Sequence, residues 1–128
     1  MKKVVVVDDS LLVRKSFEAY VANEMGMQVV GSAGDGGQGL RLVEDLKPDL
    51  LLTDLIMPVM NGQQLIEAIV TKGLGTRIVV ISASCDEPTI VKTLNLGAHS
   101  FISKPVDFST QEGRDRLREG IEIALGDP

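Results

Sequence analysis

The sequence predicts an α/β fold, a doubly wound parallel sheet of five strands with five helices. Short runs that are apolar throughout alternate along the chain with stretches whose apolar residues recur at helical spacing. A run that is apolar at every position suits a parallel strand covered by helices on both faces. The composition agrees, because 44% apolar and 24% charged residues are typical of a globular domain.

Five short segments are the expected strands. Val4–Val7, Leu50–Leu52 and Ile78–Ile81 are apolar throughout and suit central positions in the sheet. Met27–Val30 and Phe101–Ile102 are weaker runs, which we expect nearer the sheet edges.

Five segments between and after these runs have helical spacing. Ser10 is a suitable N-cap for the first helix, and Gly73, Gly97 and Gly126 suit the ends of later ones. The expected apolar stripes run from Val13 to Met25, Leu40 to Leu46, Leu65 to Ile69, Ile90 to Leu94 and Leu117 to Leu125. Right-handed crossovers place helices on both faces, and five such units fit the flavodoxin-like strand order 2-1-3-4-5.

Length and charge limit what the protein can be. A chain of 128 residues fits a single domain, residues 1–128. Its net charge of −5 repels phosphate backbones, so we expect no nucleic-acid partner. The first apolar run stops at Asp8, too early for an export signal, and no run reaches the ~18 apolar residues of a membrane span. The single cysteine, Cys85, fits a cytoplasmic location without disulfides.

Polar side chains follow four of the expected strands. Asp8 and Asp9 follow the first strand, Asp54 the third, Ser82 the fourth and Lys104 the fifth. The carboxyl ends of parallel strands lie at one edge of the sheet, where sheets of this kind bind ligands. We therefore expect the three carboxylates, the hydroxyl and the ammonium group to share one site.

This set of groups favours phosphoryl chemistry with a metal ion. Three carboxylates and one ammonium leave a charge near −2, and ligands that are all oxygen favour Mg²⁺. Lys104 and the Ser82 hydroxyl are suitable donors to phosphate oxygens. Asp54 is the best placed nucleophile for an aspartyl-phosphate, because its strand is expected between the first and fourth strands.

Single residues of the set have simpler explanations. An aspartate pair after a strand often only caps a helix, and a lone lysine usually lies at the surface. The joint placement at four adjacent strand ends has no such explanation. Pro58, Asn61 and Gly62 are interpreted as ordinary turn residues, and His99 has no partner that the sequence identifies.

Several segments together resemble the response-regulator receiver domain of two-component signalling, in its stand-alone CheY-like form. The resemblance covers nearly the whole chain, and the order and spacing of its parts make it specific. Its parts are Asp8-Asp9, the segment from Thr53 to Pro58 with Asn61-Gly62, Ser82-Ala83, Gly97-Ala98 leading to Phe101, and Lys104-Pro105.

The resemblance implies a phosphorylation site and a metal site. Asp54 would accept a phosphoryl group from a sensor histidine kinase. Asp9, Asp54 and the backbone carbonyl of Ile56 would bind Mg²⁺ directly, and Asp8 would act mainly through metal-bound water. Ile56 is a departure, since many relatives carry a polar or sulfur-containing residue there.

The resemblance also implies a switch. Ser82 and Lys104 would contact the phosphoryl oxygens, and Phe101 would turn inward as Ser82 moves toward the phosphate. The Lys104–Pro105 bond is often cis in the family. A partner protein would then bind the face formed by the fourth helix, the fifth strand and the fifth helix, which we expect to include Ile90 and Ser103.

The leading interpretation is a phosphorylation-activated response regulator in chemotaxis or a phosphorelay, and not an enzyme. The chain also fits a receiver excised from a larger regulator, such as a transcription factor or methylesterase. A Mg²⁺-dependent phosphohydrolase would need an acid two positions after Asp54, where this chain has Ile56. A flavin-binding protein would need a Ser/Thr/Gly-rich first loop, which this chain lacks. A degenerate receiver that serves only for docking would not need the acidic and basic residues, which this chain has.

Overall fold

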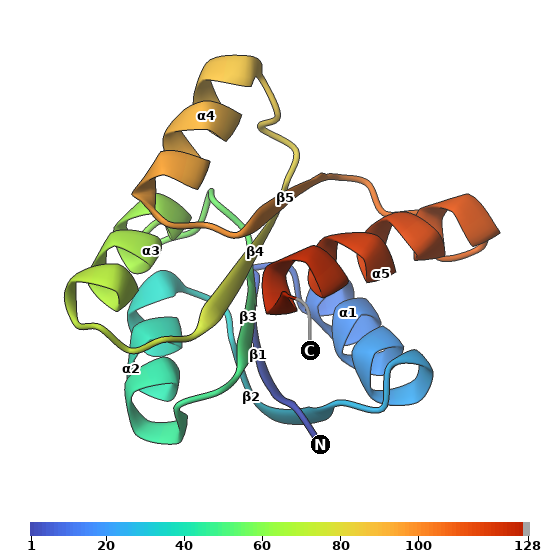
Figure 1. Cartoon of the computed structure of the whole chain (residues 1–128), viewed down its shortest axis with the longest axis horizontal. Coiled ribbons are helices and arrows are strands. Elements are labelled where there is room, and N and C mark those ends of the chain that lie inside the picture. Colours follow the sequence, from blue (N-terminus) through green and yellow to red (C-terminus); the bar gives the residue numbers. More distant parts are fainter. Residues whose placement is uncertain (127–128) are drawn as a thin grey trace.

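The computed structural model describes residues 1–126, so residues 127–128 of the expected domain lie outside the described residues. Five strands and five helices alternate along the chain, as predicted (Figure 1). In chain order they are β1 (Lys3–Val7), α1 (Leu11–Glu24), β2 (Gln28–Ala33), α2 (Gly36–Leu46), β3 (Leu50–Thr53), α3 (Gly62–Thr71), β4 (Arg77–Ser82), α4 (Glu87–Leu96), β5 (Ser100–Ser103) and α5 (Gln111–Leu125). None of the helices in residues 1–126 is long and apolar enough to cross a membrane.

The sheet has the predicted order, β2-β1-β3-β4-β5, and all its strand pairs are parallel. The two weaker runs form the edge strands, also as predicted. Both are longer than predicted, because β2 continues through Ser32 to Ala33 and β5 begins at Ser100 and ends at Ser103. Backbone hydrogen bonds between paired strands set the ends of β2 and β5, and the apolar character of the side chains does not predict those bonds. The carboxyl ends of β1, β3, β4 and β5 therefore lie in a row.

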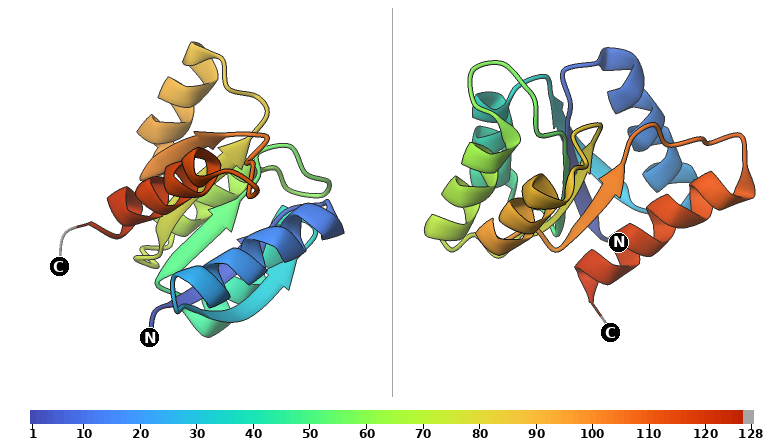
Figure 2. Two further views of the ribbon diagram at one scale, coloured as in Figure 1. Left: turned by 90° about the vertical axis from the view of Figure 1, so that its right-hand side faces the viewer. Right: turned by 90° about the horizontal axis from the view of Figure 1, so that it is seen from above.

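Helices cover both faces of the sheet, as doubly wound topology requires (Figure 2). On one face, α1 and α5 lie side by side, and Phe17 and Leu117 join one buried cluster with Val4 and Val6 of β1. On the other face, Val43 of α2 and Leu65 of α3 belong to a second cluster, which includes Val5 and Val7 of the same strand. Successive β1 residues thus face opposite layers, which explains why the strand is apolar at every position.

Ser10 is the N-cap of α1, as predicted, and its hydroxyl oxygen accepts a hydrogen bond from the Val13 N–H at 3.3 Å. The helix ends at Glu24, one residue before the predicted Met25, which forms the C-cap and packs partly buried against the core. The cap fixes where α1 starts relative to the end of β1, three residues earlier.

His99 has a partner that the sequence did not identify, the backbone of Ile78. The Ile78 N–H donates to Nδ1 of His99 at 3.0 Å, and the His99 N–H donates to the Ile78 carbonyl at 2.8 Å. The side chain thereby extends the β4–β5 ladder, whose first residue pair is Val79 and Ser100. Partial burial, with a smaller contribution from the Arg77 guanidinium, holds the pKa of His99 below its usual value.

This geometry predicts a pH-dependent contribution to stability. Because the folded-state pKa of His99 is lowered, the contribution is complete above the unfolded-state value of about 6.5 and is lost as pH falls through the folded-state pKa. We expect His99→Asn, whose amide oxygen can accept the same bond without titrating, to flatten the fall in unfolding free energy between about pH 7 and pH 5. Urea denaturation at several pH values measures this, and equal slopes for the two proteins would contradict it.

Candidate functional site

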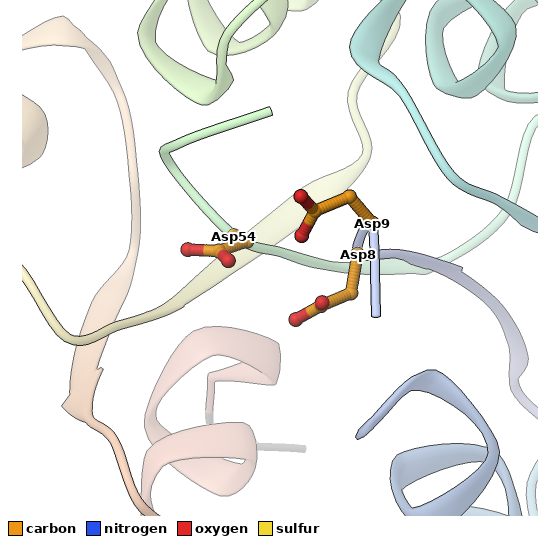
Figure 3. A group of neighbouring side chains, drawn as sticks. All are labelled: Asp8, Asp9 and Asp54. Atoms are coloured by element: carbon orange, nitrogen blue, oxygen red, sulfur yellow. The ribbon is translucent and has the colours of Figure 1, made fainter. Parts of the chain in front are cut away.

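Three carboxylates meet at the carboxyl edge of the sheet, as the sequence predicted. Asp8 and Asp9 follow β1, and Asp54 follows β3. One carboxylate oxygen from each residue lies within 4.8 Å of the others, and Figure 3 shows the three side chains grouped together. Asp8 and Asp54 are buried, whereas Asp9 is exposed. The cluster is therefore open to solvent on the side of Asp9, and oxygens so placed suit a hard cation such as Mg²⁺.

Lys104 joins this cluster from the end of β5. Its Nζ donates to Oδ2 of Asp8 at 2.7 Å and to Oδ2 of Asp54 at 2.9 Å. Burial disfavours the ammonium form, but the bonds to both carboxylates outweigh burial and hold the pKa of Lys104 above its usual value. The Lys104–Pro105 peptide is cis, as the family resemblance implied.

Backbone groups hold the two buried carboxylates. Asp8 Oδ1 accepts from the Ser10 N–H at 2.9 Å, and Asp54 Oδ1 accepts from the Leu55 N–H at 2.7 Å. Each residue is also tied to a neighbouring strand through its own N–H. The Asp9 carboxylate has no hydrogen bond to any described residue, so its direction depends on the backbone that carries it. Hydrogen bonds thus hold the carboxylates of Asp8 and Asp54 in place, whereas none to a described residue holds that of Asp9.

Ser82 lies at the end of β4, buried at 1% exposure. Its hydroxyl oxygen accepts from the Ser84 N–H at 3.1 Å, which leaves its own proton available to a further acceptor. Its backbone carbonyl accepts from the Lys104 N–H at 2.9 Å. Ser82 is thus linked to Lys104 through the backbone, and no hydrogen bond joins its side chain to the carboxylates in the described part of the chain.

Ile56 and Phe101 have apolar side chains in different surroundings. The Ile56 side chain is 68% exposed and lines a hollow of about 410 Å³ together with Ser84 and Thr89. Phe101 is partly buried and packs against the cluster beneath α2 and α3. Neither side chain is a polar member of the site, so any contribution from Ile56 to a metal would come from its backbone.

The turn interpretation of Asn61 and Gly62 was incomplete. Asn61 is the N-cap of α3 and forms a capping box with Gln64. The Asn-x-x-Gln spacing is a sequence signal that could have identified it. A Cβ on Gly62 would lie 2.3 Å from the Asp54 carbonyl oxygen, and the Gly62 N–H donates to the Leu55 carbonyl at 2.8 Å. Gly62 therefore lets α3 start directly against the backbone that carries Asp54.

A second close backbone contact holds Met60, near the end of the loop that connects Asp54 to α3. The Gly36 N–H donates to the Met60 carbonyl at 3.1 Å, and a Cβ on Gly36 would lie 2.1 Å from that oxygen. Between the two contacts, Val59 adopts a φ of 69° and is 87% exposed. A left-handed β-branched residue is costly, so the surrounding contacts must fix this loop.

Comparison with known proteins agrees with this geometry. The family model of the response regulator receiver domain matches residues 4–116. The chain belongs to this family. Among solved receivers, the response regulator domain of Thermotoga maritima CheB is similar to it with a TM-score of 0.88 and 31% identity, over 100% of this chain and 99% of that one. The receiver domain of NarL from Mycobacterium tuberculosis, also 31% identical, has a TM-score of 0.84 over 94% of this chain and 92% of that one.

Curated relatives of this receiver are longer proteins. A protein-glutamate methylesterase/protein-glutamine glutaminase of Koribacter versatilis is 37% identical over 93% of this chain, which spans 32% of that protein. The nitrate/nitrite response regulator NarL of Escherichia coli K12 is 36% identical over 97% of this chain, which spans 55% of that protein. The similarity covers one part of each relative.

The crowded carboxylates predict that this receiver gains stability when one charge is removed. Without divalent cations, we expect Asp9→Asn to raise the melting temperature by roughly 2–4 °C, because repulsion falls and no hydrogen bond to a described residue is lost. Thermal melts in a chelator at low ionic strength measure this. Glu119→Gln, the same charge change at an exposed position of α5, is the control. A rise no larger than that of the control would refute the repulsion.

Proposed function

We propose that this receiver is a phosphorylation-dependent switch. Asp54 accepts a phosphoryl group from a sensor histidine kinase, with Mg²⁺ bound at the same edge of the sheet, and the change alters binding to a partner protein. The observation that supports this most is the Lys104 ammonium placed between two buried carboxylates beside a third. Such a set offers a nucleophile, a cation site and a donor to phosphate in one place.

The metal site would use oxygens of this chain from two strands. Asp9, Asp54 and the Ile56 backbone carbonyl would hold Mg²⁺ directly, and Asp8 would act through metal-bound water. When bound, Mg²⁺ would neutralise charge on the carboxylates and the incoming phosphoryl group. Spacing within 4.8 Å and an exposed Asp9 both favour entry of a small hydrated cation.

Phosphoryl transfer would proceed by displacement at phosphorus. A carboxylate oxygen of Asp54 forms a new P–O bond while the P–N bond to the kinase histidine breaks, and the departing imidazole keeps the electron pair and takes a proton. Lys104 would exchange its bond to Asp54 for one to a phosphoryl oxygen and retain Asp8 as its other partner. Ser82 would donate its free hydroxyl proton to a second phosphoryl oxygen.

The signal would leave through the side of the sheet that carries β4 and β5. Movement of Ser82 toward the phosphate would free space for Phe101 to turn inward and reshape the face formed by α4, β5 and α5. Ile90 and Ser103 are partly exposed there. A shallow groove of about 630 Å³ on α4, lined in part by Val91 and Leu96, offers an apolar surface to a partner. Chemotaxis and phosphorelays both use proteins of this kind.

We also propose a domain organisation, a catalytic status and a location for this chain. The chain forms one receiver unit that assists its own phosphorylation and dephosphorylation and is not an enzyme on free metabolites. Its free, exposed Cys85 fits a reducing cytoplasm. A second candidate is the receiver part of a longer regulator, a transcription factor or methylesterase, which the length of the curated relatives favours.

The phosphoacceptor assignment has a direct test. We expect a small phosphodonor with Mg²⁺ to add one phosphoryl group to this protein, measured by intact-mass spectrometry, and we expect Asp54→Asn to abolish the addition. Asp9→Asn should still be modified, only at higher Mg²⁺ concentrations. Undiminished modification of Asp54→Asn, with the phosphoryl group found on another residue, would contradict the assignment of Asp54 as the phosphoacceptor.

The proposed switch predicts where a phosphoryl mimic perturbs the protein. With beryllofluoride and Mg²⁺, amide NMR shifts should change around Asp54 and also at Phe101 and Ile90. Ser82→Ala removes the donating hydroxyl, so the changes at Phe101 and Ile90 should disappear. Ser84→Ala is the control, because its side chain makes no hydrogen bond to a described residue. Changes that never reach Phe101 in the unsubstituted protein would show that the signal leaves by another face.

A further inference from the structure

Arg14 contacts the backbone of the acidic site. It lies on α1, and its Nη1 donates to the backbone carbonyl oxygen of Asp8 at 2.7 Å. Gly34 leaves room for it, since a Cβ there would lie 3.2 Å from the same nitrogen. Arg14 Nε is buried and has no hydrogen-bond partner within residues 1–126. A buried donor without a partner costs free energy, so the unpaired Nε lowers the stability of the fold. A contribution to stability is therefore a weak explanation for an arginine at this position.

The acceptor of this bond belongs to the peptide unit that joins Asp8 to Asp9. A peptide unit is planar, so fixing its carbonyl also fixes the N–H and Cα of Asp9. The Asp8 side chain has other anchors, Ser10 and Lys104. The Asp9 side chain has none among the described residues, so this peptide unit sets the direction in which its carboxylate leaves the backbone.

We infer that Arg14 is a positioning residue of the Mg²⁺ site, acting on Asp9 through the Asp8–Asp9 peptide. The inference rests on the proposed function, which makes Asp9 a direct ligand. The guanidinium also places a positive charge at the backbone of Asp8, where it offsets carboxylate repulsion. Residues that orient a metal ligand in this way commonly affect affinity by 10–100-fold, roughly.

The experiment compares Mg²⁺ affinity in matched variants of the whole chain by titration calorimetry. Arg14→Met removes the bond and one positive charge. Lys15→Met removes the same charge from the adjacent residue, whose side chain is 64% exposed and lies 3.8 Å from Glu18. We expect Arg14→Met to weaken Mg²⁺ binding about tenfold and Lys15→Met to change it less than about twofold. Arg14→Lys, which keeps a charged donor, should recover most of the loss.

Kinetics separate positioning from general damage to the fold. In Arg14→Met, the Mg²⁺ concentration for half-maximal phosphorylation by a small phosphodonor should rise by about the same factor, while the rate at saturating Mg²⁺ stays near that of the unsubstituted protein. Should Arg14→Met fail to fold, Arg14→Gln against Lys15→Gln makes the same comparison with a side chain too short for the bond.

The outcomes separate the inference from the function on which it rests. Equal Mg²⁺ affinity in the Arg14 and Lys15 variants would overturn the role of Arg14 and leave the proposed function standing. Absence of Mg²⁺ binding in the unsubstituted protein would overturn the metal site itself, and the inference with it.

Discussion

The site depends on one ammonium group held between two buried carboxylates. Asp8 and Asp54 follow neighbouring strands and lie where like charges would otherwise destabilise the sheet edge. Lys104 reaches them from the fifth strand, with bonds of 2.7 and 2.9 Å. A buried charge pair gains little unless its remaining atoms are also satisfied. Here each carboxylate has a backbone N–H on its other oxygen, so the arrangement is complete.

This bridge depends on a parallel sheet with this strand order. Residues 8, 54 and 104 come together only because β1 and β3 are adjacent and β4 and β5 extend the row in the same direction. The two apolar layers fix the strands, since successive β1 residues belong to opposite clusters. Polar chemistry at the edge is thus positioned by apolar packing on both faces of the sheet.

Apolar runs and helical spacing were sufficient to predict the strand order, the ten elements and the edge where polar groups gather. What the sequence could not predict involves main-chain partners. His99 bonds to the backbone of Ile78, Arg14 to the carbonyl of Asp8, and Gly62 packs against the carbonyl of Asp54. Backbone carbonyl and N–H groups are common to nearly all residue types, so the sequence carries no signal for which of them a side chain will contact. The ends of β2 and β5 escaped prediction for the same reason, because ladder pairing and not side-chain character decides them.

The two glycine contacts make the surroundings of Asp54 mechanically uneven. On the side of α2 and α3, the loop from 54 to 61 is tied at both ends by backbone hydrogen bonds, at contacts too close for any side chain on Gly36 or Gly62. On the side of α4, the stretch after β4 runs through exposed Ala83 and Cys85, and the Ser82 side chain joins it by one hydrogen bond to the Ser84 N–H. A displacement at Asp54 would therefore have to break more backbone contacts on the side of α2 and α3 than on the side of α4.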